Sequence, residues 1–412
     1  MQFTVDQLTD KYNVSAAVAE SNNYPNIRVV TVTESWAHTP QTQFTVPPVS
    51  PWSVASSTTI GAGNWTATSA VCWFYGKKLY DVTGVPQGLV SSNWGGTTIK
   101  SWSDNATNAA CNATEGYAAA PAAEGYTAHP TVANDPMRNH GYGVLFNAMI
   151  APLAYGPMGV RTFIWYQGEE DYEFSINALN FPLYACIQPL MISSWRKYFD
   201  VPDAFFGFVE LQPWASPFPV SPQLAVFRAA QLEALKLPNV GFAIATDIGD
   251  PTSPFGSIHP RNKPLIGARL AAAALTIVYN TPTNYLPPTL ATSTAGSSGD
   301  GTALTVAVTF SNLPSTLIAA EDHCKTEAPY NVSATLCGFF EILTSDGLKL
   351  NATATIAADG KSLTLTAAAS SPAGVTATGS SFGWNAWPIN VITSAEGLPL
   401  QPWPFVQVSV ND

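Results

Sequence analysis

The sequence predicts an α/β fold, in which helices flank a parallel sheet, followed by a smaller all-β sandwich domain. Three observations lead to this prediction. Apolar strand-like runs alternate with helix-like runs up to about residue 285. A stretch rich in Pro, Thr, Ser and Gly then covers residues 280–301. Beyond it, short runs typical of antiparallel strands are separated by turn residues. We therefore expect an α/β domain over 1–285 and a β-sandwich accessory domain over 286–412.

The expected elements of the first domain follow in order along the chain. Continuous apolar, β-branched and aromatic runs predict strands at 26–32, 88–92, 160–167, 204–211 and 240–247. Apolar residues at helical spacing predict helices at 69–84, 144–156, 176–199, 222–236 and 265–279. Gly84 provides a C-terminal stop for the first of these helices. Strands that are apolar throughout indicate a parallel sheet covered on both faces.

Composition excludes several classes of protein. The net charge of −11 leaves no basic stripe for nucleic acid, and no apolar run is long enough to span a membrane. The five cysteines lack metal-ligand spacing, so we expect neither a metal nor another cofactor. We make no prediction of the oligomeric state.

The cysteines and glycosylation sequons bear on the cellular compartment. Cys324 and Cys337 bracket a short loop and are candidates for a disulfide, whereas Cys72 and Cys186 lie in apolar helical stretches and are expected to pack in the core. The start "MQFTVDQLTD" lacks the features of a signal peptide. Six sequons nevertheless favour a secreted glycoprotein: Asn13, Asn64, Asn105, Asn112, Asn331 and Asn351.

Polar residues follow three of the expected strands. They form the stretches "SSNWGGT" (91–97), "QGEED" (167–171) and "DIGD" (247–250), and the last leads to His259 in "GSIHPRNK". Chemistry in open parallel sheets gathers at the carboxyl ends of the strands. Paired glycines and a side-chain amide can supply hydrogen-bond donors to a developing oxyanion, and a histidine can act as a general base.

The same stretches carry a resemblance to a known family. "SAVCWFYGKKLYD", "SSNWGGT", "IWYQGEED", "SIHPRNK" and "FGWNAWP" occur in order and with similar gaps over nearly the whole chain. In these motifs the sequence closely resembles the sialate O-acetylesterases, which are SGNH-type carbohydrate esterases. The resemblance implies hydrolysis of O-acetyl esters on sialic acid or a related acetylated sugar.

Roles for individual residues follow from this resemblance. It implies that His259 is the general base, that the backbone of Gly95 and Gly96 forms an oxyanion hole, and that Gln167 is a second donor. Trp94 and Glu169 are the expected substrate-binding residues, with a structural hydrogen bond as the alternative for Glu169. Glu170 stands where the family usually has a small residue, which either alters substrate preference or adds a solvated surface charge.

The carboxylate that orients His259 is left open between two candidates. Many SGNH esterases place an Asp three residues before the histidine, but that position is Gly256 here. Asp247, which closes a strand, is slightly favoured over Asp250, which opens the loop to His259. A Ser–His dyad without a carboxylate is the third possibility.

The nucleophile of the family is the serine of a Gly-Gln-Ser-Asn-Met motif, and Met1 aligns with the last residue of that motif. We therefore expect the serine, the first strand of the sheet and any signal peptide to lie upstream of Met1. The chain as written is then expected to be inactive. Ser91 and Ser92 are the alternative nucleophiles within it.

Two other functions compete with ester hydrolysis. One is a glycoside hydrolase that uses Glu169 and Asp171 as its acids. The other is a non-catalytic sugar-binding protein, in which Trp94, Trp165 and Tyr166 offer stacking faces. For the esterase, the insertion at 115–141 is either a wall of the substrate site or a flexible surface loop. A secreted or lysosomal location is expected.

Overall fold

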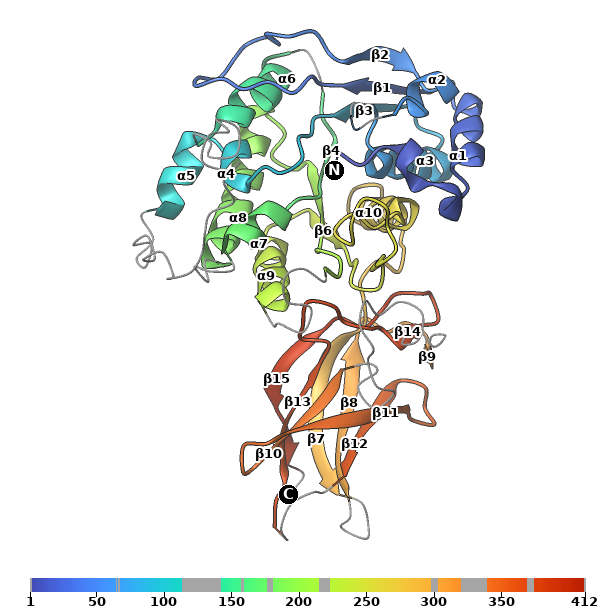
Figure 1. Cartoon of the computed structure of the whole chain (residues 1–412), viewed down its shortest axis with the longest axis vertical. Helices are drawn as coiled ribbons and strands as arrows, with labels where there is room; N and C mark the ends of the chain where they lie inside the picture. Colours follow the sequence, from blue (N-terminus) through green and yellow to red (C-terminus); the bar gives the residue numbers. More distant parts are fainter. Residues whose placement is uncertain are drawn as a thin grey trace. The chain divides into compact units, whose positions relative to one another are not determined.

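The computed structural model describes residues 2–63, 65, 67–112, 142–156, 159–175, 181–214, 223–297, 303–319, 339–368 and 374–410. The chain forms two compact units (Figure 1). Unit 1 comprises 1–211, 227–243 and 261–283. Unit 2 comprises 212–226, 244–260 and 284–412, so two loops from the earlier part of the chain join the C-terminal strands.

Unit 1 contains parallel strands flanked by helices, which confirms the predicted fold class. Strands β1 (Ile27–Thr31) and β3 (Gln87–Ser91) run parallel, and β2 (Ser50–Val54) pairs antiparallel with β1 at the edge. Strands β4 (Thr162–Trp165), β5 (Phe205–Val209) and β6 (Val240–Ala243) form a second parallel set. The sequence did not predict β2, because it contains a proline and polar residues, which an edge strand tolerates.

The six strands described above form two three-stranded sheets, in the orders β2-β1-β3 and β4-β5-β6, in which all pairs except β1 with β2 are parallel. Among the described strands, β3 pairs only with β1, and β4 pairs only with β5. β5 and β6 are buried throughout, whereas Phe163 and Ile164 of β4 are half-buried. One side of β3 and one side of β4 therefore lack a described strand partner.

Two long helices pack tightly against each other in unit 1. Helix α3 (Ala70–Thr83) begins at the N-cap Ser69 and ends at Gly84, which has φ = +68°. Helix α10 (Lys263–Val278) begins at the N-cap Asn262. The two backbones approach so closely that a Cβ added to Gly267 would lie 2.7 Å from Cβ of Phe74.

Apart from α3, α10 and α8, the described helices have ten residues or fewer. The predicted helix at 144–156 is a π-helical turn followed by α6, and the described part of the predicted helix at 176–199 is α8. The bounds are α1 Val14–Glu20, α2 Ser57–Ile60, α4 Ile99–Trp102, α5 Asn105–Asn112, α6 Ala151–Tyr155, α7 Glu169–Ser175, α8 Phe181–Tyr198 and α9 Gln223–Leu232, with the π-helix η4 at Phe146–Ile150 and 3₁₀ turns η1 Val5–Leu8, η2 Asp10–Tyr12, η3 Ser21–Asn23 and η5 Glu233–Lys236.

A disulfide joins Cys111 of α5 to Cys186 of α8. The prediction that Cys186 is a core-packing thiol was wrong, since its partner lies 75 residues away and no local pattern indicates that pairing. Cys72 is a buried free cysteine, as predicted. Cys324 and Cys337 lie outside the described residues.

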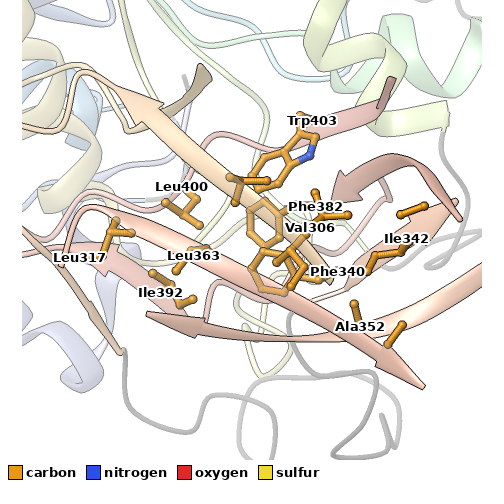
Figure 2. Packing of buried hydrophobic residues seen from close by; sticks show 14 residues of the cluster. Val306, Leu317, Phe340, Ile342, Ala352, Leu363, Phe382, Ile392, Leu400 and Trp403 are labelled. Carbon is orange, nitrogen blue, oxygen red and sulfur yellow. The ribbon is translucent and has the colours of Figure 1, made fainter. Parts of the chain in front are cut away.

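Unit 2 contains the predicted all-β domain. Its main sheet is nearly barrel-like, with the strand order β15-β13-β10-β11-β12-β8-β7-β16. Phe340 and Phe382 stack in its core with their ring centroids 4.5 Å apart, and the Trp403 ring packs against them at a tilt (Figure 2). The bounds are β7 Thr289–Ser297, β8 Ala303–Ser311, β10 Phe340–Thr344, β11 Lys349–Ile356, β12 Ser362–Ala368, β13 Ala377–Phe382, β15 Trp403–Gln407 and β16 Ser409–Val410, with a separate pair β9 Leu317–Ala319 and β14 Ile392–Ser394.

Within the described part of the chain, no helix is both long enough and apolar enough to cross a membrane.

Candidate active site

The loop after β3 carries the predicted glycine pair at the surface of unit 1. Gly96 has φ = +67°, a backbone conformation that favours glycine. The Gly95 N–H donates to Oε1 of Gln2 at 2.6 Å. The amide oxygen of Gln2 therefore accepts a hydrogen bond from the N–H group of Gly95, which the sequence analysis predicts to bind an oxyanion. Gln2 in turn donates to the Glu34 carboxylate.

The segment after the glycine pair is held from several sides. The hydroxyl of Thr97 donates to the Trp94 carbonyl at 2.7 Å and accepts from Nε1 of Trp102 at 2.9 Å. Thr97 is buried and Ile99 is fully buried, in contrast to the exposed glycines. The turn is thus anchored on its inner side and open at Gly95 and Gly96.

Gln167 follows β4 and joins this segment to the next strand end. Its Nε2 donates to the Thr97 carbonyl at 3.0 Å and to Oδ2 of Asp171 at 2.5 Å, while its Oε1 accepts from the Tyr184 hydroxyl at 3.0 Å. Both N–H bonds of the amide are therefore used within the protein. Donation from Gln167 to an oxyanion would require the loss of one of these two bonds.

Asp171, in the first turn of α7, is the centre of the same network. Its Oδ2 also accepts from the Ile99 N–H at 2.8 Å, and the residue is 8% exposed. Burial raises the pKa of this carboxyl to about 7, and the charge of Glu170 adds to the rise. The bonds from Gln167 and Ile99 and the charge of Lys100 oppose it.

The aromatic residues beside this network are buried. Trp165 lies between Trp102 and Trp195, with ring centroids 6.0 and 5.7 Å away, and its Nε1 donates to the Tyr184 hydroxyl. Tyr166 is 4% exposed. Trp94 is half-buried. Of the three proposed stacking faces, Trp165 and Tyr166 therefore have little surface to offer a sugar.

The predicted acids after β4 lie in different environments. Glu169 begins α7 and is half-buried, and its charge contributes to the raised pKa values of Tyr166 and Tyr184, for which burial is the main cause. Asp171 is buried and bonded to two donors. The pair therefore does not resemble two acids that share a solvent-filled sugar site.

His259 lies in the 244–260 segment of unit 2 and is half-buried. Its Nδ1 is 2.7 Å from the Phe255 carbonyl oxygen, and its own carbonyl accepts from the Ser253 hydroxyl at 2.7 Å. A carbonyl can only accept, so Nδ1 carries the proton in this bond. In the neutral ring, the lone pair is then on Nε2, as a general base requires.

The two candidate carboxylates lie in the same segment. Asp250 is 1% exposed, and it accepts from the Thr252 hydroxyl at 3.2 Å through Oδ1 and from the Ser253 N–H at 3.1 Å through its carbonyl. Asp247 is half-buried. The Phe255 carbonyl was not foreseen as a partner of His259. The feature of the sequence that could have indicated this partner is Gly256. Its φ of +84° allows the turn that brings the Phe255 carbonyl to the His259 ring.

The serines considered as alternative nucleophiles bond to the backbone. Ser91 is 3% exposed and its hydroxyl oxygen accepts from the Ser69 N–H at 3.1 Å. The Ser92 hydroxyl donates to the Met149 carbonyl at 3.0 Å. Neither arrangement provides the exposed, base-activated hydroxyl that nucleophilic catalysis needs.

Two basic residues after His259 hold the beginning of the chain. Nζ of Lys263 lies 4.6 Å from the Tyr166 ring centroid and 5.1 Å from that of Phe3, and Arg261 donates to the Thr9 hydroxyl at 3.3 Å. In the sequence they are visible only as part of the "SIHPRNK" motif. Their burial in unit 1 gives them a packing role.

The described residues contain no group of three or more His, Cys, Asp or Glu side chains placed to hold a metal ion. The 115–141 insertion, proposed as a wall of the substrate site, lies outside the described residues.

Comparison with solved structures indicates that the fold is that of a carbohydrate esterase. The structure resembles that of a carbohydrate acetylesterase from Xanthomonas citri, with a TM-score of 0.72 and 26% identity, over 98% of this chain and 77% of that chain. A family model described as "Carbohydrate esterase, sialic acid-specific acetylesterase" matches residues 11–276. The chain therefore belongs to the sialic acid-specific acetylesterase family of carbohydrate esterases.

Curated relatives bear the same family name. The sequence is 33% identical over 310 residues to the sialate O-acetylesterase of Mus musculus, covering 68% of this chain and 54% of that protein. It is 32% identical over 293 residues to that of Homo sapiens, covering 68% of this chain and 51% of that protein. The chain thus spans about half the length of the curated relatives it matches.

Proposed function

We propose that the protein hydrolyses O-acetyl esters on sialic acid or a related acetylated sugar, through an acyl-enzyme. The observation that carries the proposal is the hydrogen bond from Nδ1 of His259 to the Phe255 carbonyl. It leaves Nε2 with the lone pair that removes the proton of a serine nucleophile and later of water. Asp247 and Asp250 are the carboxylates that would stabilise the imidazolium.

The N–H groups of Gly95 and Gly96 are the proposed donors to the tetrahedral oxyanion. The Gly95 N–H already donates to an amide oxygen at 2.6 Å, which supports this proposed role. In this role the substrate oxygen displaces Oε1 of Gln2. Gln167 is the remaining candidate donor, at the cost of a bond to Thr97 or Asp171. Trp94 and Glu169 would contact the sugar.

The nucleophile is proposed to be a serine on a segment that precedes Met1. Three observations support this. Ser91 and Ser92 are engaged with the backbone. β3 and β4 each have one side without a described strand partner. Residues 2–4 lie beside the loop after β3 and the start of α3, since Gln2 bonds to Gly95 and Thr4 pairs with Ser69. A strand that leads into these residues would end at the proposed site.

The disulfide between Cys111 and Cys186 supports a secreted or lysosomal location, because disulfides persist in oxidising compartments. The six sequons support a glycoprotein.

The test compares the 412-residue chain with the same chain extended upstream by its own gene sequence. Both are assayed for acetate release from O-acetylated sialic acid and from acetylated xylan. We expect activity in the extended protein only, and a fall in kcat by about 10²–10⁴-fold for His259→Ala.

The matched control is His38→Ala, which removes an exposed imidazole elsewhere and is expected to retain activity. Full activity of His259→Ala in the extended protein would contradict the role of His259. Labelling of the 412-residue chain by a fluorophosphonate would show that its nucleophile lies within it.

A further inference from the structure

The buried carboxylate of Asp171 connects two strand-end loops of unit 1. A single oxygen, Oδ2, accepts both the Ile99 N–H at 2.8 Å and Nε2 of Gln167 at 2.5 Å. Ile99 belongs to the segment after β3, and Gln167 to the segment after β4. The two donors are 68 residues apart in sequence. Oδ2 of Asp171 therefore connects two parts of the chain that no local hydrogen bond could connect.

The contacts converge on the residues that follow the glycine pair. Thr97 is the next residue after Gly96, and its carbonyl receives the second N–H bond of Gln167 at 3.0 Å. Asp171 thus acts on the turn in two ways, directly through Ile99 and indirectly through the orientation of Gln167. Tyr184 completes the set by donating to Oε1 of Gln167, which fixes which end of the amide faces Thr97.

The residues that would bind the substrate oxygen differ from the residue that holds their loop in place. Gly95 and Gly96 are exposed, whereas Asp171 and Ile99 are buried. We therefore expect a substrate oxygen to meet the exposed Gly95 N–H and not the buried carboxylate of Asp171. A donor that binds a developing charge is effective only when it is held in place before the reaction, and a carboxylate that accepts two N–H bonds is a strong means of holding it.

We propose that Asp171 is a positioning residue, whose carboxylate holds the Gly95–Gly96 turn in the geometry needed to receive the oxyanion. The kinetic part of this inference rests on the proposed esterase function. The structural part, that Asp171 immobilises residues 95–99, does not.

The first measurement is backbone amide hydrogen exchange of the full 412-residue chain, which needs no activity. For Asp171→Ala we expect exchange in residues 95–99 to accelerate at least tenfold relative to the wild type, because both acceptor bonds are lost. Asp171→Asn retains an oxygen that accepts the same two N–H groups, so it should restore most of the protection. The matched control, Glu170→Gln, removes the neighbouring charge and should leave this segment unchanged.

An equal exchange rate at 95–99 in Asp171→Ala and Glu170→Gln would overturn the inference. So would an acceleration spread equally over β5 and β6, because that result shows general destabilisation. Should Asp171→Ala fail to fold, Gln167→Met tests the indirect route. It removes both Nε2 bonds at similar side-chain length and leaves the bond between Asp171 and Ile99. Exchange should then accelerate at Thr97 and Thr98, and unchanged exchange there would contradict the action of Asp171 through Gln167.

The second measurement is kinetic and uses the upstream-extended protein. A residue that positions the oxyanion turn without touching substrate should lower kcat in Asp171→Ala, by at least tenfold, with KM changed less than twofold, and Asp171→Asn should recover most of kcat. An equal loss in both variants, or a change in KM alone, would contradict the positioning role. If the extended wild type shows no esterase activity, the proposed function fails, and the exchange experiment still tests the structural role of Asp171.

Discussion

At the scale of single residues, the fold determines the burial and the hydrogen-bond partners of each side chain, whereas the sequence shows only its type. Asp171 appears in the sequence as one of three consecutive acids, yet the fold buries it beside two N–H donors. His259 appears as a loop histidine, yet a neighbouring carbonyl fixes the proton on its Nδ1. The proposed roles of both residues therefore depend on one or two short hydrogen bonds.

The raised pKa of Asp171 predicts a pH-dependent stability. Its pKa is about 7 in the folded protein, compared with an ordinary value of 3.8, so the folded state holds this proton more tightly than the unfolded state. The free energy of unfolding should then fall as pH rises from about 4 to about 7, by on the order of 4 kcal/mol from this group. Lys100, Glu170, Glu169 and Tyr184 are the neighbouring ionisable groups.

Urea unfolding at pH 5 and pH 8 tests this prediction. The wild type should lose more stability between these two pH values than Asp171→Asn, which cannot ionise. Equal losses in the two proteins would show that Asp171 does not titrate in this range.

At the scale of elements, close approach between helices α3 and α10 shapes unit 1. Gly267 permits this approach, because its absent side chain would meet Cβ of Phe74 and the backbone of Tyr75. The apolar pattern of both helices is visible in sequence. The sequence does not show that α3 packs against α10, because this pairing depends on how the helices cover the sheets.

Gly267→Ala should destabilise the protein. The new Cβ would lie 2.7 Å from Cβ of Phe74 and 2.8 Å from N of Tyr75, so the helices must separate. Overpacking of this kind costs about 1–3 kcal/mol, which should outweigh the gain of about 1 kcal/mol in helix propensity.

Thermal unfolding of Gly267→Ala and of the control Gly159→Ala checks this expectation. A Cβ on Gly159 would meet no atom within 4 Å, so that variant should unfold near the wild-type temperature. An unchanged or higher Tm for Gly267→Ala would show that the helix pair adjusts at no cost.

At the scale of the whole molecule, the chain combines an α/β unit and a unit that contains the β domain. The hydrophobic centre of the β sheet is formed by residues from 306 to 403. In unit 1, a covalent link between α5 and α8 adds to the packing. Because the linked cysteines are 75 residues apart, the disulfide limits the freedom of a long stretch of the unfolded chain.

Loss of the disulfide should lower stability by about 2–4 kcal/mol. The comparison is between the wild type and the double variant Cys111→Ser with Cys186→Ser, each unfolded by heat with and without a reducing agent. We expect the reductant to lower the Tm of the wild type and to have little effect on the double variant. A wild-type Tm that does not respond to reduction would indicate that this link contributes no stability.

The sequence by itself determined the α/β class, the all-β domain and, within a few residues, those strands and helices of unit 1 that it predicted, because helix and strand periodicities and turn residues act over short distances. It also marked His259, Gly95, Gly96 and Gln167 as candidates. It did not indicate the short helices α1, α2, α4, α5 and α7. It did not reveal the edge strand β2, the link between Cys111 and Cys186, the Phe255 carbonyl at His259, or the network around Asp171. Only the tertiary structure decided these features, because the residues involved are brought together by folding and a residue's type does not specify its partner.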